Sequence, residues 1–155
     1  MMVGNGVVHA GWGAAAGQGV ICDRDLVEKL LAAHGELTAA TAAQVTELRA
    51  VLLRGDTADR SIARSSLSNT ILGRLARYRA PSPSDPEQVG RATKIRRLAL
   101  VVRDYRAEIA ANRDQLATLV DELVPGLTAH AGMGPLTAAK TILDSTGAPQ
   151  RDTGT

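Results

Sequence analysis

Hydrophobic residues recur at three- and four-residue intervals along most of the chain, which is the spacing of one face of an α-helix. A first run starts after Asp23, a residue that can cap a helix, and predicts a helix to about Arg54, where Gly55-Asp56 ends it. A second run predicts another amphipathic helix that reaches about Arg79. The apolar positions are Leu26, Leu30, Ala33, Leu37, Val45, Leu48 and Leu52 in the first run, and Ile62, Leu67, Ile71, Leu75 and Tyr78 in the second.

The most regular pattern predicts a third helix in the second half of the chain. Its positions alternate gaps of three and four residues over four heptads, which is typical of a coiled coil. This apolar seam consists of Ile95, Leu98, Val102, Tyr105, Ile109, Asn112, Leu116, Leu119 and Leu123. Asn112 is its one polar member, and a buried amide there can fix the helix register. The seam fits equally well a helical hairpin within one chain and a homo-oligomer of several chains.

The remaining segments divide the chain into parts. Residues 1–22 contain six glycines and no period, and we expect a disordered leader there. Residues 23–123 form the predicted helical region, interrupted by a loop at 80–86, where three prolines interfere with helix. Residues 124–147 contain a separate turn and helix, and residues 148–155 are expected to be a disordered tail. The predicted fold class is therefore all-α, a long antiparallel helical hairpin followed by a short helical element.

Composition supports thin helical layers and excludes some classes of site. Phe is absent and aromatic residues make up only 2% of the chain, although 45% of it is hydrophobic. Cys22 is the single cysteine, so neither an internal disulfide nor a thiolate cluster for zinc can form. No segment has the pattern of a signal peptide or a membrane span, and we expect a cytoplasmic protein without a membrane partner.

The net charge of +2 hides a basic block in the middle of the chain. Residues 60–106 carry eleven basic and three acidic side chains, whereas the segments on both sides are net negative. Ten of the eleven basic residues are arginines, whose planar guanidinium suits phosphate groups. The block is compatible with nucleic-acid binding, for which Arg96, Arg97 and Arg103 are candidate residues, and equally with a solvated helix face.

A second candidate site lies at the turn Gly132-Met133-Gly134-Pro135, directly before an alanine-rich helix start. Glycines let the backbone approach a ligand closely, and the free amides at a helix start suit a phosphate. We expect Met133 to plug between two short helices while the amides of Gly132 and Gly134 and the Thr137 hydroxyl face a DNA strand. Lys140 would add a positive charge one turn later.

The stretch from Gly132 to Ala139 resembles the helix-hairpin-helix element, which grips nucleic-acid backbone without reading bases. Four segments in order resemble the middle of the insertion-sequence one-ten family of transposases, the bridge-RNA-guided group. They are LRAVLLRGD (48–56), RRLALVVR (96–103), ANRDQLATL (111–119) and VDELVPGLTAHAGMG (120–134). The resemblance covers about residues 23–143 and implies partners that include DNA and a guide RNA.

In that family an N-terminal RuvC-like domain holds divalent metal through four acidic residues, and a later serine is the nucleophile. Neither region has a counterpart here, so we expect no catalytic residue, no metal ligand and no cofactor in this chain. The serines at positions 61, 65, 66 and 68 lack an assignable base and receive no catalytic role. The expected function is DNA binding by a transposase fragment that does not itself transfer strands. The alternatives are a helical oligomerisation module and a decayed product that folds poorly alone.

Overall fold

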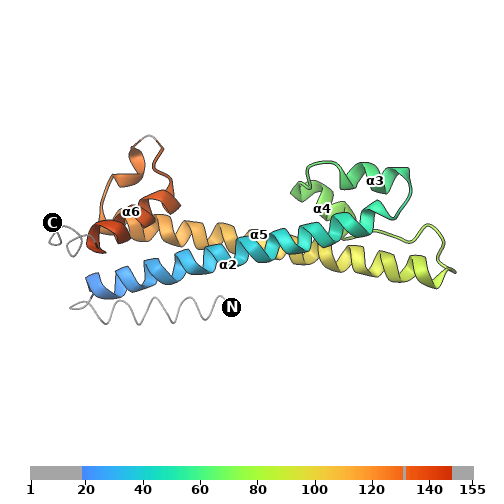
Figure 1. The fold of residues 1–155 in the computed structure, drawn as a ribbon, viewed down its shortest axis with the longest axis horizontal. Coiled ribbons are helices and arrows are strands. Elements are labelled where there is room, and N and C mark those ends of the chain that lie inside the picture. Colours follow the sequence, from blue (N-terminus) through green and yellow to red (C-terminus); the bar gives the residue numbers. More distant parts are fainter. Residues whose placement is uncertain (1–18, 131, 148–155) are drawn as a thin grey trace. The chain divides into compact units, whose positions relative to one another are not determined.

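A computed structural model of the chain describes residues 19–130 and 132–147, and every regular element within them is helical (Figure 1). This confirms the predicted all-α class. The elements are α2 (Gly19–Leu53), α3 (Thr57–Ala63), α4 (Asn69–Leu75), α5 (Pro86–Leu123), the 3₁₀ turn η2 (Leu127–Ala129) and α6 (Pro135–Gly147). The predictions of a leader over residues 1–18 and of a tail over 148–155 lie outside the described residues.

The first helix begins earlier than predicted. Because α2 starts at Gly19, residues 19–22 belong to a helix and not to a disordered leader. Asp23 therefore lies inside the first turns of α2, and its assignment as the capping residue was wrong. No proline lies between Gly19 and Asp23, so the helix can extend toward the N-terminus beyond Asp23. The ability of Asp23 to cap a helix does not require the helix to begin there.

The second predicted helix is in fact two short ones, α3 and α4, and side-chain caps explain the break. The Asp56 carboxylate accepts a hydrogen bond from the Asp59 amide at 2.9 Å and starts α3. The Ser68 hydroxyl accepts one from the Ile71 amide at 3.2 Å and starts α4. Between them the Ser65 hydroxyl donates to the Ile62 carbonyl at 2.7 Å. Serines that bond to nearby backbone compete with a continuous helix, and the periodicity alone does not reveal this.

The third helix also begins earlier than the sequence predicted. Pro86 is the first residue of α5 and not the last residue of the loop. Proline is favoured at the first position of a helix, where a backbone donor is not needed. The Asp85 carboxylate accepts a hydrogen bond from the Glu87 amide at 3.0 Å and so provides the cap. The predicted loop 80–86 is thereby shortened at its end.

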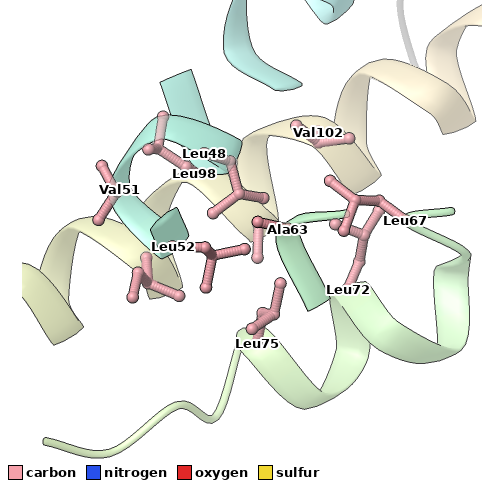
Figure 2. Packing of buried hydrophobic residues seen from close by; sticks show 11 residues of the cluster. Leu48, Val51, Leu52, Ala63, Leu67, Leu72, Leu75, Leu98 and Val102 are labelled. Atoms are coloured by element: carbon pink, nitrogen blue, oxygen red, sulfur yellow. The ribbon is translucent and has the colours of Figure 1, made fainter. Parts of the chain in front are cut away.

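The chain forms two compact units. The central unit comprises residues 35–110, and the terminal unit comprises the described residues on either side of it, 19–34, 111–130 and 132–147. In the central unit, the end of α2, the short helices α3 and α4, and the first half of α5 enclose one apolar cluster (Figure 2). Its members are Leu48, Val51, Leu52, Ala63, Leu67, Leu72, Leu75, Ile95, Leu98, Ala99 and Val102. The first three seam positions are thus covered by residues of the same chain.

The terminal unit has its own apolar cluster, which joins the first half of α2, the second half of α5 and α6 (Figure 1). Its members are Val27, Leu116, Leu119, Val120, Ala138, Ala139 and Ile142. The seam positions Leu116 and Leu119 are therefore also buried within one chain, and Leu123 packs at the margin. Tyr105 and Ile109 remain half-buried.

Asn112 is buried in the terminal unit, with 6% of its surface exposed. Its side-chain amide donates to the Leu30 carbonyl of α2 at 3.0 Å, while its Oδ1 has no hydrogen-bond partner in the described part of the chain. A buried amide at this position can fix the helix register. The structure gives it a backbone partner within the same chain.

Candidate nucleic-acid interface

The predicted backbone-binding turn forms a defined structure at the start of α6. Gly132 has a φ of 76°, a left-handed conformation that favours glycine. The Met133 amide donates to the His130 carbonyl at 3.1 Å, and the Ala138 amide donates to the Gly134 carbonyl at 2.9 Å. Pro135 is the first residue of α6. The turn is therefore ordered and leads directly into a helix.

The predicted contact residues of this turn are open to solvent. Gly132, Gly134, Thr137 and Lys140 are all exposed, and a Cβ added at either glycine would meet nothing within 4 Å. Among the described residues, no hydrogen bond uses the amide of Gly132 or Gly134. A strand could approach this backbone closely, because the space next to both glycines is open within the described residues.

The element differs from the expected hairpin in its first arm. The residues before the turn form only η2, a single 3₁₀ turn of three residues, and not a short α-helix. Gly126, with a φ of 83°, breaks the chain direction just before it. Met133 is half-buried and packs against the same cluster as Leu127 of η2 and Leu136 of α6. The Met133 side chain therefore contacts the apolar cluster of the terminal unit. The Thr141 hydroxyl donates a hydrogen bond to its sulfur at 3.9 Å.

The three arginines predicted to bind nucleic acid lie on α5 in the central unit and differ in their surroundings. Arg97 and Arg103 are exposed and have no side-chain partner among the described residues. Arg96 is half-buried, and its guanidinium donates to the Tyr78 carbonyl at 2.8 Å and to the Thr93 hydroxyl at 3.2 Å. Arg96 therefore has a structural role that the sequence did not predict.

Four other arginines of the central unit also donate to backbone carbonyls at the ends of helices. Arg49 bonds to the carbonyls of Ala63 and Ser65 at 2.6 and 2.8 Å, just where α3 ends. The remaining three bonds are Arg60 to Gly55 at 2.7 Å, Arg91 to Val51 at 3.2 Å and Arg106 to Leu67 at 2.6 Å. The carbonyls of Ala63, Gly55, Ser65 and Leu67 lie at the end of a helix or in a connector, where the guanidiniums supply a donor. The Val51 carbonyl also accepts a hydrogen bond from the Arg54 amide at 3.2 Å. Arginines next to short helices could have indicated this carbonyl-bonding role. The sequence analysis missed it because it predicted one continuous helix where the structure has α3 and α4.

A buried ion pair completes the polar framework of the central unit. The Arg91 guanidinium pairs with the Asp59 carboxylate, which also accepts a hydrogen bond from the Tyr78 hydroxyl at 2.6 Å. The Arg91 guanidinium lies over the Tyr78 ring, 5.8 Å from its centre. Gly55 packs so closely on this pair that any Cβ there would collide with both side chains.

The surroundings of this pair shift two pKa values. Burial raises the pKa of Tyr78, and its hydrogen bond to Asp59 raises it further. Burial by itself would lower the pKa of Arg91, but the bonds to Asp59 and Tyr78 outweigh it and leave the pKa above its usual value. Each shift favours the protonated form of the group. Asp59, Arg91 and Tyr78 together link α3, α5 and the segment after α4. Because Tyr78 and Arg91 both retain their protons, neither is available as a base.

The arginines of the central unit fall into two sets, which differ in whether the guanidinium bonds to the protein. One set bonds to the protein, as described above. The other set is exposed and has no side-chain partner among the described residues: Arg54, Arg64, Arg74, Arg77, Arg79, Arg97 and Arg103. Several acidic residues of this unit are meanwhile occupied, because Asp56 and Asp85 cap helices, Asp59 pairs with Arg91 and Glu47 pairs with Lys94 at 2.9 Å.

The charge of each unit follows from this distribution. The central unit carries thirteen basic and eight acidic residues, and the sequence on both sides of it, 1–34 and 111–155, carries five basic and eight acidic ones. The positive field that attracts anions is therefore concentrated on the central unit. The turn at Gly132 belongs to the net negative unit, where Lys140 is the nearest cation in the sequence.

Two further features bear on the class of site. Within the described residues, no three His, Cys, Asp or Glu side chains converge as metal ligands would, and no helix is long and apolar enough to cross a bilayer.

Comparison with family models, curated proteins and solved structures gave no match. The resemblance to the insertion-sequence one-ten transposases therefore stays a prediction from the four quoted segments.

Proposed function

We propose that this chain binds the sugar-phosphate backbone of DNA, as a fragment of transposition machinery without strand-transfer chemistry of its own. The observation that carries the proposal is the set of seven exposed arginines on the central unit, whose side chains bond to none of the residues that the structure describes. A guanidinium that serves no packing or bonding role in the protein is available for phosphate. The net positive charge of the same unit adds long-range attraction.

The turn at Gly132 is a second contact within this proposal. Its exposed amides and the hydroxyl of Thr137 offer donors to one phosphate, and Lys140 offers a charge. Since the terminal unit is net negative, we assign this turn a positioning role and the central unit most of the affinity. The transposase origin depends on the resemblance of the quoted segments and on nothing else.

The test is a titration of the whole chain with a labelled DNA duplex, followed by fluorescence anisotropy at 50 and 200 mM salt. Binding through about four phosphates should weaken about 100-fold between these concentrations, because the released counterions drive association. Arg97→Gln with Arg103→Gln should reduce the slope of log affinity against log salt by about two. Both side chains are exposed, so folding should be unaffected.

A matched pair of substitutions controls for the loss of charge. Lys29→Gln with Arg113→Gln removes the same two charges from exposed positions of the terminal unit. This control should leave the salt slope within the error of the unmodified chain. If DNA binds at 50 mM salt neither as duplex nor as single strand, or if both double variants lower the slope equally, the proposal is wrong.

A further inference from the structure

A small hollow in the central unit combines two arginines with an apolar floor. It has a volume of about 290 Å³ and is lined by Arg79, Ala80, Pro83, Val89, Ala92 and Arg96. Three of these residues come from the connector between α4 and α5. The other three, at positions 89, 92 and 96, have the three- and four-residue spacing of a single face of α5.

Hydrogen bonds hold the two walls of the hollow together. The Ser82 amide of the connector donates to the Gln88 side chain of α5 at 2.8 Å. On the other side, the Arg96 guanidinium donates to the Tyr78 carbonyl at 2.8 Å. The Asp85 amide also donates to the Ser82 carbonyl at 3.1 Å and closes the connector into a turn. The hollow is therefore formed before any ligand arrives, which lowers the entropic cost of binding.

The two arginines differ in how much of their hydrogen-bonding capacity remains. Arg79 is exposed and has no side-chain partner among the described residues. Arg96 uses two donors, to Tyr78 and Thr93, and an arginine has five. Its remaining donors are held in a fixed orientation. Together the pair offers positive charge and several donors at one hollow, which fits an anionic group such as a phosphodiester.

The floor of the hollow requires a second property of the ligand. Val89 is one of the large hydrophobic residues that remain exposed, at 39%, and Ala92 is buried beneath the surface at 1%. An apolar surface beside guanidinium groups favours a ligand that has a flat apolar part next to its negative charge. A nucleobase with its phosphate has this combination, and bases also stack on guanidinium planes.

We infer that this hollow takes one unpaired nucleotide, and that the chain therefore prefers single-stranded over duplex nucleic acid. The inference rests on the proposed function and specifies its substrate class. In a duplex the bases are stacked inside and only the backbone reaches the hollow, so Val89 would contact nothing. At about 290 Å³ the hollow lies near the lower limit of ligand sites, so we assign it one nucleotide and not several.

Anisotropy with a labelled 12-nucleotide strand and with the corresponding 12-base-pair duplex, at one salt concentration, tests the preference. The strand should bind at least about threefold more tightly per site. RNA of the same sequence should behave like DNA, because neither the arginines nor the floor contacts a specific sugar group. Equal or tighter binding of the duplex overturns the inference but leaves the proposed function intact. No binding of either overturns both.

Val89→Ser isolates the apolar floor. It should lower strand affinity about three- to tenfold and change duplex affinity less than about twofold. Val124→Ser is the matched control, because Val124 has the same exposure, 40%, in the terminal unit. It should change neither affinity. Equal effects of Val89→Ser on strand and duplex, or equal effects of both variants, contradict a base contact.

Val89→Trp provides a readout that does not depend on a loss of function. In a chain carrying Trp12→Phe, the new indole is the only tryptophan. Stacking of a base on it should tighten strand binding about fivefold or more and quench its fluorescence. The duplex should produce neither effect. Unchanged fluorescence on strand binding would show that no base reaches the hollow.

Discussion

The two units share the long helices α2 and α5 but are stabilised in different ways. The central unit surrounds its apolar cluster with arginines that bond to helix-end carbonyls and with the buried pair of Asp59 and Arg91. The terminal unit relies on apolar packing, and Asn112 is its one buried polar residue among those described. The difference follows from the elements that each unit adds. The short helices α3 and α4 bring connectors whose carbonyls accept bonds from arginines, whereas α6 contributes apolar side chains to its cluster.

The comparison also separates two uses of positive charge. In the central unit some arginines stabilise the protein and others remain available for a ligand, although the sequence gives both sets the same appearance. In the terminal unit the proposed contact uses mainly backbone amides. Substitutions in each unit, and a change of pH, test this contrast.

The largest effect should follow from breaking the buried pair. Asp59→Ala leaves the Arg91 charge and the Tyr78 hydroxyl without their shared acceptor and should destabilise the central unit by about 3 to 5 kcal/mol. Hydrogen exchange read by mass spectrometry should show faster exchange in residues 57–75 and little change in α6. Asp104→Ala, at an exposed position of the same unit, should have almost no effect. Equal loss of protection in both units would contradict separate stabilisation.

Asn112→Leu should act in the opposite direction on the terminal unit. It removes a buried oxygen that has no partner, at the cost of one hydrogen bond to Leu30, and should stabilise by about 1 kcal/mol in urea unfolding. Because the seam is covered within the chain, sedimentation should give the same oligomeric state as before. A changed oligomeric state would support a seam between chains.

The turn before α6 can be tested with a pair of alanines. Gly132→Ala forces a side chain into the left-handed region and should destabilise the terminal unit by about 1 kcal/mol. Gly134→Ala meets no atom and should leave stability unchanged. If a DNA strand lies against this turn, Gly134→Ala should still weaken duplex binding about threefold, which anisotropy can measure. Unaltered affinity would confine binding to the central unit.

The smallest effect concerns alkaline pH. The pKa of Tyr78 is raised in the folded chain, so the folded state retains this proton more strongly than the unfolded state does. The resulting stability is complete below the unfolded pKa of about 10 and is lost as pH rises through the folded pKa. Urea unfolding between pH 8 and 11 should show this loss, and Tyr78→Phe should reduce it. Tyr105→Phe serves as the control within the same unit.

The sequence predicted the helices better than their ends. Periodicity located α2 and α5, and proline and glycine located the turn before α6, because these signals act on the local backbone. The periodicity did not reveal that Ser65 and Ser68 divide the second run into two helices. Their hydroxyls bond to the backbone of Ile62 and Ile71, and the spacing of apolar side chains carries no information about such bonds. Nor could it separate the structural role of Arg96 from the exposure of Arg97. That distinction depends on the Tyr78 carbonyl, which only the folded chain brings near.

Gly55 has a consequence for changes to this protein. Its hydrogen atoms face the Arg91 and Asp59 side chains where any larger group would have to stand. Any side chain at this position therefore requires the Arg91 and Asp59 side chains to shift. Gly35, Gly73 and Gly90 face open space and accept a side chain, so glycines that look alike in the sequence differ in how replaceable they are.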